Sequence, residues 1–250
     1  ENTAAIYKFI RDQMLHYVNL GYTSAEIANT LRLPEKIDKV WYTRQYYGTL
    51  SHNIKAVYQR YMGWYDANPV NLNLLTPEET AKKIVEYMGG DAKRILEMAR
   101  IDYAKGDYQW GAQVTKELVY ADPSNMEARR LCADALEQLG YQCESGTWRN
   151  AYLTGAMELR AGTPSDKQYG TGEGIANMLG AGSIDMIFEY AAIATDSHSV
   201  ENNDVTVNFI IGDEKCCVVR RNGVILTYMN QTFDKVDATA KGTKAAPVNY

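Results

Sequence analysis

The residues best suited to chemistry lie between positions 41 and 65, where one histidine, His52, stands among unusually dense aromatic side chains. Those aromatic residues are Trp41, Tyr42, Tyr46, Tyr47, Tyr58, Tyr61, Trp64 and Tyr65. A tyrosine combines a large apolar ring with a polar tip, so a wall of such rings suits a substrate with an apolar part and a polar head. Arg44 offers a planar fork of donors that can pair with an anion. The alternative interpretation is a tightly packed aromatic core between helices.

The other chemically capable residues form no complete active site. His16 and His198 lie in contexts typical of packing or surface residues, and a lone histidine such as His52 is more often structural than catalytic. The sequence contains no HxH, HExxH, CxxC, GxSxG or Walker motif. The adjacent Cys216 and Cys217 would face opposite sides of a strand, and we interpret all four cysteines as buried, small apolar residues. The residues alone therefore predict no metal site.

Composition argues against two classes of partner. The 250 residues carry a net charge of −5 with dispersed Lys and Arg, so no nucleic-acid surface is predicted. Residues 23–45 have the spacing of a helix-turn-helix, but the acidic context argues against DNA binding. No apolar run approaches the roughly 20 residues that a membrane helix needs. We expect neither a nucleic-acid partner nor a membrane span.

Helices are predicted for most of the first 162 residues. A helix over 6–21 is followed by one that Thr23 or Ser24 caps, with Glu26 placed for a capping box. Thr76 is predicted to cap a later helix with two glutamates in its first turn.

An internal period of 34 residues follows, because Ala99 and Ala133 are separated by that number, as are Gly106 and Gly140. This spacing matches the tetratricopeptide (TPR) pattern, in which small residues let two helices approach closely. At most about one and a half repeats are visible, fewer than the three that a free-standing solenoid needs. The unit must therefore pack on another domain or on a copy of itself.

The character of the sequence changes after Gly162, where a polar linker is predicted, followed by one or two helices over 175–196. The next segment alternates as a strand does, which puts four apolar residues on one face: Val205, Val207, Phe209 and Ile211. Asn222-Gly223 is typical of a type I′ hairpin turn, and a last strand is expected within 233–243. Three strands with at least one free edge would form an incomplete sheet, so we expect a chain cut from something longer. The predicted fold class is α+β, with a helical region before a smaller α+β domain.

One known family resembles this chain in two long blocks, RQYYGTLSHNIKAVYQRYMGWYDANPVNLNLLTPEETAKKIVEYMGG and KGDYQWGAQVTKELVYADPSNMEARRLCADALEQLGYQCESGTWRNAYLTGAMELR. The family is the linear alkylsulfatases, the SDS-hydrolysing enzymes of the metallo-β-lactamase superfamily. The resemblance implies a helical tail of the catalytic domain over 1–75 and a TPR-like dimerisation domain over 76–162. More loosely, 163–250 resembles a truncated domain of sterol-carrier-protein-2 (SCP2) type.

The resemblance also implies an activity and its residues. Such enzymes use two zinc ions, and the HxHxDH loop that binds them is absent here, so the zinc-binding domain is expected upstream and this chain alone is expected to be inactive. In the intact enzyme His52 is expected near the sulfate group, binding it or passing a proton, with zinc ligation as the alternative. The residues expected to support the pocket for the alkyl sulfate substrate are Arg44, Tyr46, Tyr47 and Asn53.

Expectations about partners follow from the same resemblance. A unit of one and a half repeats leaves an apolar face uncovered, and two copies can cover one another, so we expect a homodimer built mainly on 76–162. The SCP2-like domain is expected to cradle an aliphatic chain. The alternative function is a non-catalytic TPR-like adaptor fused to a lipid-carrier domain. The compartment stays open, with the resemblance favouring the periplasm or secretion.

Overall fold

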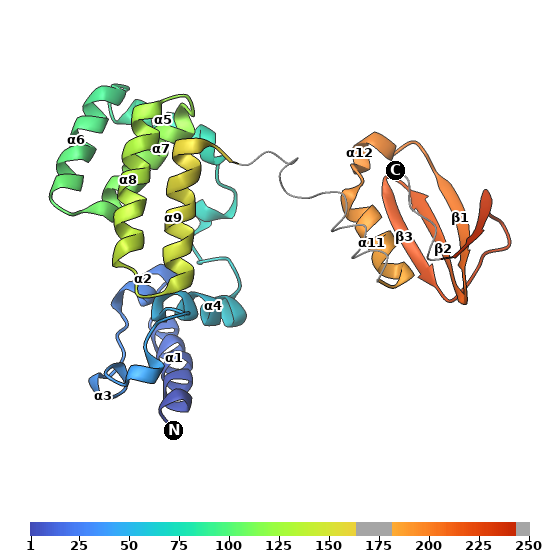
Figure 1. Cartoon of the computed structure of the whole chain (residues 1–250), viewed down its shortest axis with the longest axis horizontal. Helices are drawn as coiled ribbons and strands as arrows, with labels where there is room; N and C mark the ends of the chain where they lie inside the picture. Colours follow the sequence, from blue (N-terminus) through green and yellow to red (C-terminus); the bar gives the residue numbers. More distant parts are fainter. Residues whose placement is uncertain (164–181, 244–250) are drawn as a thin grey trace. The chain divides into compact units, whose positions relative to one another are not determined.

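The computed structural model describes residues 1–163 and 182–243 and divides into two compact units, Glu1–Thr163 and Pro164–Tyr250 (Figure 1). The first unit is helical, and the described part of the second combines helices with a small sheet. This arrangement confirms the predicted α+β class, a helical region followed by a smaller α+β domain. The polar linker and the start of the helix predicted over 175–196 lie outside the described residues.

The helices of the first unit follow one another through short connections. They are α1 (Asn2–Asn19), α2 (Ser24–Thr30), α3 (Glu35–Asp38), the 3-10 turn η1 (Trp41–Thr43), α4 (Leu50–Met62), the 3-10 turn η2 (Pro69–Leu72), α5 (Pro77–Tyr87), α6 (Ala92–Ala104), α7 (Tyr108–Ala121), α8 (Met126–Gln142) and α9 (Gly146–Ala161). No helix within the described ranges is both long and apolar enough to span a bilayer.

Two of the predicted helix starts are confirmed as capping boxes. The Thr23 hydroxyl accepts from the backbone N–H of Glu26, whose carboxylate accepts from the backbone of Thr23 in return. Thr76 and Glu79 make the same reciprocal pair at the start of α5. Hydrogen bonds from the hydroxyl and backbone N–H of Thr76 lower the pKa of Glu79, because they favour the charged carboxylate.

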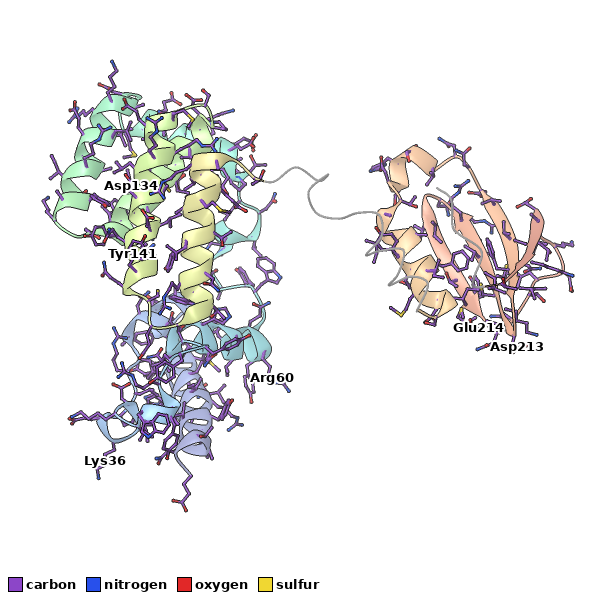
Figure 2. The ribbon with its side chains drawn as sticks, in the orientation of Figure 1. Lys36, Arg60, Asp134, Tyr141, Asp213 and Glu214 are labelled. Carbon is purple, nitrogen blue, oxygen red and sulfur yellow. The ribbon has the colours of Figure 1, made fainter. Side chains whose placement is uncertain are left out.

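Two hydrophobic clusters hold the first unit together. One joins α1, α2 and α4, and its buried members are Ile10, Met14, Ile27, Ala28, Leu31, Leu50, Ile54 and Tyr58. The other joins α6, α7 and α8, and its buried members are Ile95, Leu96, Ala99, Leu118, Ala128 and Leu131. Helix α9 packs along α8, and an ion-pair network from Arg160 to Asp134 and Glu137 crosses between them, next to Tyr141 (Figure 2).

The 34-residue spacing describes the alanines better than the glycines. Ala99 and Ala133 are both buried within helices, as close packing requires. Gly106 has a φ of +87° in the turn between α6 and α7, whereas Gly140 lies inside α8. A Cβ on Gly140 would lie 3.0 Å from the Leu153 side chain, so that glycine admits α9 rather than making a turn. The two glycines therefore have different roles.

The second unit contains α11 (Ile184–Ala194), α12 (Ser197–Val200) and a mixed sheet in the order β3-β2-β1-β4. Its strands are β1 (Val205–Ile211), β2 (Glu214–Arg221), β3 (Val224–Met229) and β4 (Ala238–Gly242). The described residues thus form four strands where three were predicted: β1, the two strands of the predicted hairpin at Asn222-Gly223, and β4. Both turn residues have positive φ, which confirms the hairpin. Helix α11 packs against β3, and the ring of Phe188 on this helix contacts that of Phe209 on β1 at a tilt of 52°.

Candidate functional site

The candidate site is built on the loop between η1 and α4. Thr49 caps α4 by accepting from the backbone N–H of His52 at 2.9 Å. The Gln45 side chain accepts from the backbone N–H of Leu50 at 2.7 Å, which folds the loop back onto the helix start. The loop carries Arg44, Tyr46 and Tyr47 directly before this helix.

Four of the predicted site residues come together at one hollow of about 360 Å³. They are Arg44, Tyr46, Tyr47 and Asn53. Apolar side chains of α1 and α4, including Ile6, Ile10 and Leu50, line the same hollow. The hollow therefore combines a cationic group and polar tips with an apolar surface, which suits an amphiphilic anion.

His52 does not line this hollow. Its side chain is exposed on the first turn of α4, and its Nδ1 accepts a hydrogen bond from the indole Nε1 of Trp148 at 3.4 Å. The two rings meet edge to face with centroids 6.4 Å apart. The aromatic ring in contact with the imidazole thus comes from α9, not from the aromatic stretch around residue 52.

Most of that aromatic stretch is on the surface. The exposed members are Trp41, Tyr42, Tyr46, Tyr47, Tyr61 and Trp64, with Tyr47 at 80% exposure. Only Tyr58, at 6%, belongs to a hydrophobic core. The interpretation as a packed aromatic core is therefore wrong for these six exposed rings, while Tyr65 is half-buried.

The N-terminus of α9 holds the site loop in place. Ser145 and Thr147 donate from their hydroxyls to the Tyr47 carbonyl, at 2.5 and 2.7 Å. The backbone N–H of Gly146 donates to the Tyr46 carbonyl at 2.8 Å. Ser145 is only 2% exposed and also caps α9 through the backbone N–H of Trp148.

An ion pair completes this contact, because Arg44 lies 2.6 Å from the Glu144 carboxylate. Reasoning from the sequence missed residues 144–148 as part of the site. Their signal was present in the ESGTWRN stretch, where a serine precedes a helical segment, but nothing local relates it to the loop.

The residues described here do not fit a metal centre. Within 1–163 and 182–243, no group of three or more His, Cys, Asp or Glu side chains could hold a metal ion. Cys216 and Cys217 are fully buried in β2, and burial raises the pKa of Cys216 to about 11. A thiol of that kind stays protonated at neutral pH, whereas a metal needs the thiolate.

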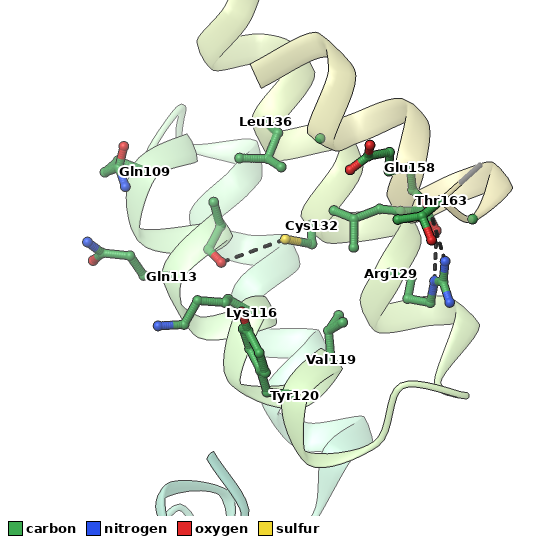
Figure 3. A pocket seen from close by; sticks show the side chains of 14 residues that line it. Gln109, Gln113, Lys116, Val119, Tyr120, Arg129, Cys132, Leu136, Glu158 and Thr163 are labelled. Carbon is green, nitrogen blue, oxygen red and sulfur yellow. Dashed lines mark hydrogen bonds between the residues drawn. The ribbon is translucent and has the colours of Figure 1, made fainter. Parts of the chain in front are cut away.

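A larger hollow of about 660 Å³ lies among α7, α8 and α9 (Figure 3). Arg129 at its edge donates to the carbonyls of Leu159 and Glu158, at 2.7 and 3.2 Å, and so ties the end of α9 to α8. Cys132 lies centrally and contacts the Ala112 carbonyl. None of the predicted site residues lines this hollow.

Comparison with known proteins gives the family. The family model described as alkyl sulfatase dimerisation matches residues 23–162, and the one described as alkyl sulfatase C-terminal matches 174–249. The chain is 50% identical to an alkyl/aryl-sulfatase of Saccharomyces cerevisiae over 94% of its length, and 45% identical to an (R)-specific secondary-alkylsulfatase of Pseudomonas sp. over 96%. It spans 36% of the length of each of these relatives.

A solved structure agrees with this assignment. The stereoselective inverting sec-alkylsulfatase Pisa1 from Pseudomonas sp. matches with a TM-score of 0.90 and 43% identity, over 97% of this chain and 38% of that one. At this identity the likeness extends beyond the fold. The chain therefore belongs to the alkylsulfatase family and corresponds to its dimerisation and C-terminal regions.

Proposed function

We propose that this chain is part of an enzyme that hydrolyses alkyl sulfate esters to an alcohol and inorganic sulfate. The observation that carries the proposal is similarity to proteins named as alkylsulfatases along at least 94% of the chain. The hollow beside α1 supports it, because a sulfate ester combines an anion with an apolar chain. In this proposal Arg44, which also pairs with Glu144, offers its remaining guanidinium donors to the sulfate, while the tyrosines and apolar side chains contact the alkyl part.

His52 is the residue we propose to act on the sulfate group. It is exposed at the start of α4, outside the hollow but one residue before Asn53, which lines it. A donor in this position stabilises the charge on the sulfate oxygens. Hydrolysis also requires zinc in this proposal, with ligands expected upstream of residue 1; in line with this, the described residues hold no group of three or more His, Cys, Asp or Glu side chains that could bind a metal.

The test uses the full-length protein and this chain side by side. Sulfate release from dodecyl sulfate and from a secondary alkyl sulfate is measured with and without a chelator. We expect activity that chelation abolishes in the full-length protein and none in the 250-residue chain. His52→Ala is expected to lower turnover without changing zinc content. No sulfate release by the full-length protein on any alkyl sulfate would refute the proposal.

The dimer is a further part of the proposal, built on TPR-like residues 76–162. It is supported by the matched dimerisation model and by exposed apolar side chains on these helices, including Ile84, Tyr87, Met98, Ile101, Tyr120, Met126, Tyr141 and Met157. Where such side chains form a contiguous patch they mark an interaction surface, which a second copy of the chain would cover. Sedimentation equilibrium of this chain is expected to give a dimer, and a monomer at high concentration would contradict it.

The C-terminal unit is proposed to be SCP2-like and to hold the alkyl chain of substrate or product. Support comes from α11 lying against the sheet and from its exposed apolar groups Met186 and Ile193. Binding of a fluorescent fatty-acid analogue to residues 164–250, absent for 1–163, would be the expected result. If the analogue bound neither part, the C-terminal unit would not hold the alkyl chain.

A further inference from the structure

The contact between Trp148 and His52 determines which imidazole nitrogen carries the proton. An indole Nε1–H can only donate, so the Nδ1 that receives it at 3.4 Å must present a lone pair. In neutral imidazole the proton then lies on Nε2. Within the described residues Nε2 has no hydrogen-bond partner, and the side chain is exposed, so this N–H is available to a ligand.

Trp148 is held in this position by its surroundings. It lies in the first turn of α9, and the start of this helix binds the loop before His52 through the hydroxyls of the N-cap Ser145 and of Thr147. On its other side the indole meets the ring of Tyr152, one helical turn further on, with centroids 6.4 Å apart. The donor is therefore fixed to the same scaffold as the imidazole.

We infer that Trp148 is a positioning residue that holds His52 as the neutral Nε2–H tautomer, so that His52 binds the sulfate group as a hydrogen-bond donor. This inference rests on the proposed function. It separates two roles that the sequence leaves open. A general acid would need both nitrogens protonated, and then Nδ1–H would face the indole N–H. A general base would need a bare Nε2. The Trp148 contact opposes both states and favours the donor.

The test combines spectroscopy on this chain with kinetics on the full-length protein. Trp148→Phe removes the indole N–H but keeps an aromatic ring, and Trp110→Phe, on α7, makes the same chemical change away from the site. In histidine-labelled protein at alkaline pH, 15N NMR distinguishes a protonated from an unprotonated ring nitrogen. The three histidines keep the spectrum simple, and a His52 variant assigns it.

We expect Nδ1 of His52 to be unprotonated and Nε2 protonated in the wild type and in Trp110→Phe. In Trp148→Phe the two 15N shifts should move toward each other as the tautomers mix. kcat/KM for an alkyl sulfate should fall about tenfold in the same variant, the factor of one net hydrogen bond.

A proton on Nδ1 in the wild type, unchanged shifts in Trp148→Phe, or an unchanged kcat/KM would each overturn the inference. Wild-type turnover by His52→Ala would instead remove the proposed function of His52. Because the NMR experiment reads the tautomer without any turnover, the two failures are distinguishable.

Discussion

Replacing Ser145 by alanine tests whether the start of α9 holds the site loop. The hydroxyl donates to the Tyr47 carbonyl at 2.5 Å and accepts from the backbone N–H of Trp148 as the cap of α9. The side chain is 2% exposed, so water cannot replace these partners without a rearrangement. The substitution therefore removes one tertiary hydrogen bond and one helix cap at once.

The two losses can be summed from typical magnitudes. An N-cap replaced by alanine costs about 1 kcal/mol. A net intramolecular hydrogen bond contributes about 1 kcal/mol more. Ser145→Ala should then lower the free energy of unfolding by about 2 kcal/mol, or move the urea midpoint by about 1 M for a typical slope of about 2 kcal/mol/M. Thr147 still donates to the same carbonyl, which keeps the loop from detaching.

Tryptophan fluorescence during urea unfolding is the appropriate assay, because all four tryptophans precede residue 149 and report on the first unit alone. Asn125→Ala is the matched control, since Asn125 caps α8 by accepting from the Ala128 N–H and its side chain makes no hydrogen bond to the loop among the described residues. It should cost about 1 kcal/mol, the cap alone. If Ser145→Ala shifted the midpoint no further than Asn125→Ala, the hydrogen bond to the loop would contribute nothing and the reasoning would fail.

Three further predictions concern the helices that support the site. Gly140→Ala should destabilise by about 1–3 kcal/mol, since its Cβ would lie 3.0 Å from a leucine of α9, whereas Gly155→Ala, with 3.5 Å of room, should be neutral or stabilising by about 1 kcal/mol; thermal unfolding compares them. Arg160→Met breaks two partly exposed ion pairs between α8 and α9, so the loss should be about 1 kcal/mol or less and should shrink in 1 M salt. Because the pKa of Glu79 is lower in the folded protein than its ordinary value of 4.5, the contribution of its carboxylate to stability is complete above pH 4.5. That contribution is lost as the pH falls through the pKa of the folded state. In Glu79→Gln the stability of α5, measured by hydrogen exchange, should therefore depend less on pH below about 4.5 than in the wild type. The same pH dependence in both proteins would contradict this.

Features that depend on neighbours a few residues apart were predictable from the sequence. The capping boxes at Thr23 and Thr76 need only a hydroxyl and a glutamate three positions on, and the Asn222-Gly223 turn needs only two residues that tolerate positive φ. The TPR-like spacing found the buried alanines and Gly140, whose small size admits α9, but its other glycine, Gly106, makes a turn instead. A periodic pattern shows that a residue must be small, not whether a turn or a second helix requires it.

The family resemblance directed attention to the residues of the hollow, yet their arrangement depends on contacts across the chain. Tyr47 meets Ser145 and Thr147, and His52 meets Trp148, over separations of 96 to 100 residues. No periodicity encodes such a pairing. It arises because the first cluster, with α4, and the helices α8 and α9 fold into one unit that brings the loop to the end of α9.

The sequence by itself determined the helices, their caps, the hairpin and the family, because local hydrogen bonding and side-chain pattern are sufficient for each. Only the tertiary structure decided which ring touches His52 and what holds the loop of Arg44 and Tyr47. The physical reason is that a hydrogen bond constrains two atoms in space, whatever their distance along the chain, and folding alone brings those atoms together.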